Sequence, residues 1–245
     1  MRERVLQLAA DDSRVVAAAE VGSFAAGSAD RWSDLDLTFA VDDAADVGGV
    51  VADWTRSLTD ELAAVHLFDL ARGATLYRVF LLPGCLQVDL SFTPAAAFGP
   101  AGPNFRLLFG TAVQEPLAPA HDPRELFGYA VLFALHARVS IERGRFWQAE
   151  YWLGELRDHA LGLAALRRGL PSREGRGADD LPPEVHARFE PALVRSLDRQ
   201  ELLRALAAAV TALLAESDDV RELAAKVAPA LEHLALTQDP AQGTG

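Results

Sequence analysis

The hydrophobic pattern of this 245-residue chain changes character at a proline-rich segment that runs from Glu115 to Pro123. Before this segment, short apolar runs of strand type alternate with helical stretches and are punctuated by glycine and proline. After it, apolar residues recur only with helical spacing. The segment itself has three prolines in nine residues, which opposes regular structure, so we expect it to link two domains.

The expected fold class is α+β, with an N-terminal α/β domain around a mixed sheet at residues 1–115 and a C-terminal all-α helical bundle at residues 120–237. Residues 238–245 are expected to be a disordered tail. In the first domain, strands are expected at residues 15–21, 34–41, 65–71, 75–82, 85–92 and 105–111. Helices are expected there at residues 2–10, just after Ser23, and through residues 50–54 to about Ala64. In the second domain, helices are expected at residues 123–143, 145–169, 183–195, 199–216 and 218–235.

Composition narrows the classes of function. The formal net charge of −12 disfavours general nucleic-acid binding, which usually needs basic patches. No apolar run reaches eighteen residues and the first residues are charged, so we expect a cytoplasmic protein without a membrane segment. The single cysteine, Cys85, excludes an intrachain disulfide and is expected to be buried apolar filler.

The segment 126–135 is apolar on nearly every face, which predicts a central helix or a dimer contact. We therefore expect the chain to be a monomer or a homodimer.

Two aspartates stand at the start of the second expected strand. Side chains alternate across a strand, so Asp34 and Asp36 project from one face while Leu35 and Leu37 project into a core. Neighbouring carboxylates repel each other unless a cation lies between them, and Mg²⁺ is held by carboxylates together with substrate phosphates. The pair therefore indicates a metal site, although an isolated Asp-x-Asp is also common on solvated edge strands.

A Gly-Ser turn and a third acid strengthen this interpretation. Gly22 permits close backbone approach, and Ser23, at the start of a helix, offers a hydroxyl and amide donors to a phosphate. Asp89 lies on the polar face of a later half-buried strand, and it joins the pair if that strand neighbours the 34–41 strand. It could then bind a metal and accept a proton from a hydroxyl. Each feature alone also has a purely structural explanation.

Together, the Gly-Ser turn, the Asp-x-Asp pair and the later aspartate resemble the nucleotidyltransferase superfamily that includes DNA polymerase β. The stretch from Gly22 to Asp36, with the helical second half, is most similar to bacterial lincosamide and aminoglycoside nucleotidyltransferases. The motifs cover roughly residues 20–92. The resemblance implies two Mg²⁺ ions, a nucleoside triphosphate, expected to be ATP, and transfer of AMP to a small hydroxyl acceptor such as an aminoglycoside or a lincosamide.

The same resemblance assigns roles to residues. Asp34 and Asp36 would bind both metals, Asp89 would bind one, and Gly22 and Ser23 would hold the triphosphate. Many relatives carry Arg or Lys immediately before the second glycine, where this chain has Ala26. A basic contact to the nucleotide is therefore either missing or supplied by Arg31.

An aromatic helix in the second half holds the candidates for acceptor binding. Residues 145–160 combine four aromatic side chains with ionisable groups. In kanamycin-type relatives a glutamate of the helical domain is the general base, which makes Glu150 the first candidate here and Asp158 the second. A plain amphipathic helix with an aromatic core stripe has the same pattern.

Two other functions are compatible with the sequence. One is a protein- or RNA-modifying nucleotidyltransferase of the toxin–antitoxin type, although no histidine follows an arginine at the spacing of the ribonucleases that accompany such proteins. The other is a catalytically silent binding module with the same fold. Retention of three acids on strand-like segments favours a metal-dependent enzyme.

Overall fold

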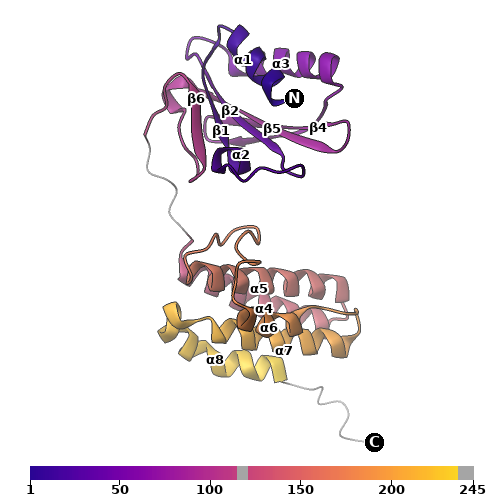
Figure 1. Cartoon of the computed structure of the whole chain (residues 1–245). Helices are drawn as coiled ribbons and strands as arrows, with labels where there is room; N and C mark the ends of the chain where they lie inside the picture. Colours follow the sequence, from indigo (N-terminus) through magenta and orange to yellow (C-terminus); the bar gives the residue numbers. More distant parts are fainter. Residues whose placement is uncertain (115–120, 237–245) are drawn as a thin grey trace, which may run out of the picture. The chain divides into compact units, whose positions relative to one another are not determined.

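The computed structural model describes residues 1–114 and 121–236. The chain divides into two compact units, the first ending at Pro119 and the second beginning at Ala120. The first combines a six-stranded sheet with helices, whereas the regular elements described in the second are all helices (Figure 1). The fold class is α+β, as the sequence predicted. Most of the expected linker, residues 115–120, and the expected tail at 238–245 lie outside the described residues.

The strands of the first unit are β1 (Val15–Val21), β2 (Leu35–Val41), β3 (Val65–Arg72), β4 (Thr75–Leu82), β5 (Leu86–Pro94) and β6 (Phe105–Phe109). They form one sheet in the order β3-β4-β5-β2-β1-β6. The central neighbours β2 and β5 are parallel, and the other neighbouring pairs are antiparallel. The sheet is therefore mixed, and every strand lies within one or two residues of its expected position.

Helices α1 (Arg2–Asp11) and α3 (Val47–Leu62) cover one face of this sheet (Figure 1). Alternating side chains of β2 and β5 fill the core beneath them, where the rings of Phe39 and Phe92 lie 4.8 and 5.2 Å from that of Trp54. We call the opposite side, where the short α2 (Gly22–Ala26) begins at the end of β1, the open face. The strand alternation therefore separates an apolar core from a face that is free to carry polar chemistry.

The second unit consists of α4 (Pro123–Glu142), α5 (Phe146–Leu166), α6 (Pro183–Phe189), α7 (Arg199–Ala215) and α8 (Arg221–Leu236) around their own core. Asp122 caps α4 by accepting a hydrogen bond from the Arg124 amide. Helix α4 is buried on one side only: Phe127 is fully buried, whereas Tyr129 and Leu132 are 46 and 40% exposed, so of the two alternatives from the sequence a fully central helix is excluded. None of the helices in the described ranges has both the length and the apolar character needed to cross a membrane.

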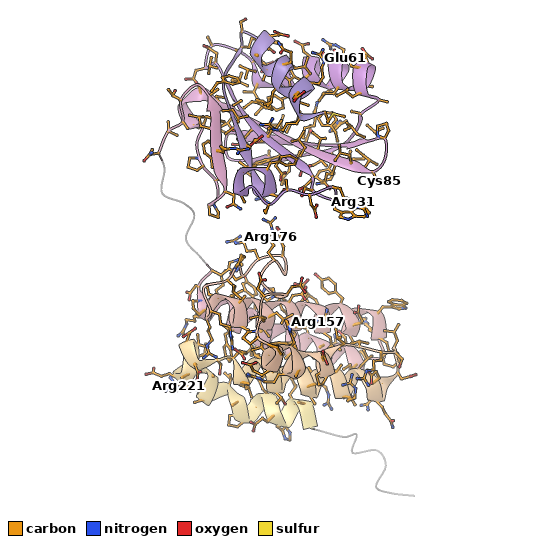
Figure 2. The ribbon with its side chains drawn as sticks, in the orientation of Figure 1. Arg31, Glu61, Cys85, Arg157, Arg176 and Arg221 are labelled. Carbon is orange, nitrogen blue, oxygen red and sulfur yellow. The ribbon has the colours of Figure 1, made fainter. Side chains whose placement is uncertain are left out.

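Helix α3 begins at Val47, because the Asp46 carboxylate accepts hydrogen bonds from the amides of Gly48 and Gly49 and so stabilises two glycines in the first turn. Two local expectations were wrong. Helix α6 ends at Phe189 instead of 195, because Pro191 cannot continue its hydrogen-bond ladder and a 3₁₀ turn follows. Cys85 is exposed rather than buried, because it lies in the β4–β5 turn with a φ of 60° (Figure 2).

A fully buried carboxylate ties α1 to the sheet. Glu20 in β1 accepts hydrogen bonds from Arg2 of α1 and Arg106 of β6. Burial raises the pKa of Glu20, but these two guanidinium groups outweigh burial and hold the pKa below its usual value. Stability from this site is therefore fully present above the ordinary glutamate pKa and is lost as the pH falls through the lowered folded-state pKa.

We expect Glu20→Gln to lower the free energy of unfolding at pH 7 by about 2 to 3 kcal/mol, because it removes the charge that both arginines contact. The difference from wild type should shrink in strong acid, where wild-type Glu20 is itself protonated. Urea denaturation across pH 2–8 measures this. Glu61→Gln is the matched control. Glu61 of α3 pairs with Arg4, which lies on α1 like Arg2, but this pair is on an exposed surface (Figure 2). Exposed pairs contribute less than about 1 kcal/mol.

Candidate metal centre

The parallel pairing of β2 with β5 positions two acids side by side. Asp36 lies in register with Asp89, between the buried pairs Leu35–Val88 and Leu37–Leu90. Because successive side chains alternate between faces, burial of the flanking residues directs both aspartates to the open face. Asp34 directly precedes β2, one residue outside the strand in which the sequence placed it.

The three carboxylates converge. Asp34, Asp36 and Asp89 each offer an oxygen atom, and these atoms all lie within 4.8 Å of one another. All three side chains are half-buried, so they are partly shielded yet accessible from the open face. Carboxylate oxygens gathered in this way are the type of ligand that Mg²⁺ binds in proteins.

Electrostatics of the trio favour a bound cation. Burial raises the pKa of Asp89, and the nearby charge of Asp34 raises it further, while a hydrogen bond from Gln87 acts in the opposite direction. The Gln87 amide donates to both Asp89 oxygens at 3.1 and 3.0 Å, but it is neutral and leaves the negative charge in place. A divalent cation would remove the repulsion between these carboxylates.

Gly22 lies against its neighbour in the trio. Gly22 has a φ of 62°, and a Cβ atom built there would lie 2.4 Å from Oδ2 of Asp36. A side chain at position 22 would therefore force the Asp36 carboxylate to move, and the positive φ also favours glycine. The Gly-Ser turn and the acid pair are thus in direct contact.

Ser23 contributes an unsatisfied hydroxyl beside this turn. Within residues 1–114 and 121–236, its buried Oγ atom has no hydrogen-bond partner. A buried hydroxyl without a partner costs about 1 to 3 kcal/mol, so such groups usually mark a missing ligand or solvent molecule. An acceptor oxygen such as that of a phosphate would satisfy it.

Arg31 lies in the loop between α2 and β2 (Figure 2). The Asp30 carboxylate shapes this loop by accepting hydrogen bonds from the Trp32 amide at 2.8 Å and the Ser33 hydroxyl at 3.2 Å. The Arg31 guanidinium carbon lies 4.2 Å from the centre of the Trp32 ring, which is 78% exposed. The cation is therefore held on the surface four residues before β2, the first of the two strands at which the trio lies.

The remaining candidates belong to the other unit. Glu150 is half-buried in α5, and Asp158 is exposed in the same helix, with an oxygen atom 3.8 Å from Arg157. The structure thus brings together Asp34, Asp36, Asp89, Gly22 and Ser23, while the role of Glu150 remains a prediction from the sequence. Gln87 was missed as a site residue, although its position two residues before Asp89 on the same strand face was a signal.

Comparisons with known proteins found no matching family model and no matching curated protein. Among solved structures, the crystal structure of an aminoglycoside 6-adenyltransferase from Bacillus subtilis is similar, with 14% sequence identity and a TM-score of 0.42. The match covers 97% of this chain and 98% of that one. At this level of identity and superposition, the match says nothing about the activity or substrate of this chain. The observed class is an α+β protein with a carboxylate trio on the open face of a mixed sheet.

The contact between Gly22 and Asp36 can be tested through metal affinity. We expect Gly22→Ala to weaken Mn²⁺ binding, measured by electron paramagnetic resonance, at least about tenfold, because the new methyl group must displace the Asp36 carboxylate. Gly27→Ala is the matched control: Gly27 also has a positive φ, 73°, but nothing lies within 4 Å of its Cβ position. Both variants should lose about 1 kcal/mol of stability, so equal metal affinities would contradict the proposed contact.

The repulsion within the trio predicts a stabilising substitution. In metal-free buffer, Asp89→Asn should raise the free energy of unfolding by about 0.5 kcal/mol, because it removes a like charge beside its cross-strand neighbour. Added Mg²⁺ should raise the melting temperature of wild type but not of the variant. Asp69→Asn is the control and should instead lower the free energy of unfolding, because the hydrogen bond from Arg78 lowers the pKa of Asp69 and stabilises its charge. Destabilisation by Asp89→Asn would contradict this account.

Proposed function

We propose that this chain is a Mg²⁺-dependent nucleotidyltransferase that moves a nucleoside monophosphate, AMP from ATP, onto a hydroxyl of a small acceptor. The observation that carries the proposal is the convergence of Asp34, Asp36 and Asp89 within 4.8 Å, in contact with a glycine turn whose serine has an unsatisfied hydroxyl. A metal-binding trio alone has many uses. A trio next to a turn suited to phosphate indicates chemistry on a phosphate ester.

The residues fit magnesium and a triphosphate. The trio supplies only carboxylate oxygens, which are the ligands Mg²⁺ prefers, and Asp34 and Asp36 would hold two ions while Asp89 holds one of them. When bound, magnesium would neutralise the carboxylates and polarise the reacting phosphate. Ser23 would donate its hydroxyl hydrogen to a phosphate oxygen, and Gly22 would let that oxygen approach the backbone. Arg31 is the proposed basic contact to the nucleotide.

In the proposed reaction, the acceptor oxygen forms a bond to the α-phosphorus of the triphosphate. The bond from that phosphorus to the bridging oxygen breaks, and pyrophosphate leaves with the electron pair. The proton of the acceptor hydroxyl passes to a carboxylate. Asp89 is the proposed proton acceptor on the sheet, and Glu150 is the proposed general base from the helical unit. An aminoglycoside or a lincosamide is a proposed acceptor.

The proposal is tested by incubating the protein with Mg²⁺ and each nucleoside triphosphate against a panel of aminoglycosides, lincosamides and purified proteins. We expect mass shifts of one nucleoside monophosphate on a small acceptor, with release of pyrophosphate. Asp36→Asn should reduce this release at least about a hundredfold while the fold stays intact, because it removes a ligand charge at the reacting phosphate.

Asp60→Asn on α3 is the control, because this exposed aspartate lies on the helix that covers the opposite face of the sheet. Unchanged turnover in Asp36→Asn would refute a metal-dependent transferase. A mass shift on a protein in the panel, or on the chain itself, would instead favour a protein-modifying enzyme.

A further inference from the structure

Beside the trio, the open face becomes apolar. One row of the sheet runs through Asp36, Asp89, Val79 and Phe68, each directly opposite the next on β2, β5, β4 and β3. Directly opposite residues of a sheet share a face, so Val79 and Phe68 lie on the same side as the two acids. The neighbouring positions on this side of β3 and β4 are also uncharged, except for Arg72 at the end of β3, which lies opposite Thr75. We call the set Phe68, Leu70, Tyr77, Val79 and Leu81 the apolar shelf.

The shelf is exposed where an ordinary sheet surface would be polar. Phe68 is 56% exposed, Leu70 41% and Leu81 38%, while Val79, next to Asp89, is nearly buried. Single exposed apolar side chains are common, but a contiguous patch of them beside a polar site is typical of a binding surface.

The opposite side of the same strands faces the helix layer, where Phe80 and Leu82 of β4 are buried in the core and the charged side chains pair with one another. Arg78 donates to both oxygens of Asp69 and, at 2.7 Å, to Thr55 of α3, and His66 lies 3.0 Å from Asp69. The Asp69–Arg78 pair therefore faces the helix layer, whereas the shelf lies on the other face of the sheet. The shelf is therefore not the rim of the core beneath α3, and its apolar character needs another explanation.

The position of the shelf relative to the Gly-Ser turn suggests its occupant. The turn follows β1, on one side of the trio, whereas the shelf lies on β4 and β3, on the other side. In an in-line displacement the attacking and leaving oxygens stand on opposite sides of the phosphorus. With the pyrophosphate held at the turn, the acceptor approaches from the side of the shelf.

We infer that the apolar shelf binds an apolar chain or ring of the acceptor, which is therefore an amphiphilic hydroxyl compound rather than a polycationic aminosugar. This inference rests on the proposed function and names its acceptor class. Strands are spaced about 4.8 Å apart, so the shelf reaches about 10 Å from Asp89, enough for a substituent of several carbons. Its uncharged side chains offer nothing to ammonium groups, whereas they exclude water from an apolar substituent.

The test uses methyl, butyl and octyl β-D-glucoside below their micellar concentrations, because these probes share the same hydroxyl groups and differ only in apolar length. Their dissociation constants are measured by calorimetry with the full chain, Mg²⁺ and a non-hydrolysable ATP analogue. Full burial of a methylene strengthens binding roughly fourfold, so a half-open shelf should give about twofold per methylene. We expect at least about a tenfold gain from butyl to octyl.

The double variant Phe68→Ser/Leu70→Ser should remove this gain, and Phe68→Leu should keep most of it. Leu107→Ser is the matched control. Leu70 and Leu107 end the same row of the sheet at opposite edges, both 41% exposed, with Tyr77, Ser91, Thr38 and Ala19 between them. Leu107 lies beyond β1, on the far side of the trio, so its loss should leave the gain unchanged.

Each outcome decides the inference. Equal affinities for the three glucosides, or a gain that survives the double variant, would overturn it while Mg²⁺-dependent binding of the ATP analogue still supported the proposed function. Failure of wild type to bind that analogue with Mg²⁺ would overturn the proposed function and the acceptor class with it. Sedimentation showing a dimer that the double variant dissociates would assign the shelf to a second copy of the chain and overturn its role in acceptor binding.

Discussion

The parallel register between β2 and β5 is the constraint on which the site depends. Leu35, Leu37 and Phe39 enter the core under α3, as do their partners on β5, and this burial leaves Asp36 and Asp89 side by side on the open face. A slip of one residue in either strand would put a carboxylate into the core and an apolar side chain on the surface. The hydrophobic effect that selects the register therefore also sets the geometry of the metal centre.

The same sheet separates two kinds of surface on its open face. The turn after β1 brings the backbone against Asp36, and both the positive φ of Gly22 and that contact favour glycine at position 22. Toward β3, the acidic side chains give way to exposed apolar ones. A polar end suited to phosphate and an apolar end therefore flank the acids, and the strand order alone produces this arrangement.

Much of this could be predicted from the sequence, because strand alternation and turn residues are local signals. The alternation at 85–92 located Asp89 on a polar strand face, but sequence left open whether that strand neighbours Asp36, because parallel pairing joins distant segments. Cys85 was misplaced since its hydrophobicity suggested burial, whereas the turn after Gly84 forces a positive φ and exposure. The apolar shelf was not predicted, because β3 is exposed on both sides and its orientation follows from a bulge between His66 and Phe68.

Charge compensation distinguishes the structural carboxylates from the candidate functional one. Glu20 in the sheet unit contacts two arginines, and Glu216 in the helical unit contacts Arg167, Arg168 and Arg188, so both fully buried charges are matched by cations of the chain. Asp89 instead accepts hydrogen bonds from the neutral amide of Gln87 and stands near another acid. The chain thus stabilises its buried charges by ion pairing elsewhere but holds Asp89 with a group that orients the carboxylate without neutralising it. Such an arrangement destabilises the fold slightly on its own and becomes favourable when a cation binds, which is the property expected of a metal ligand.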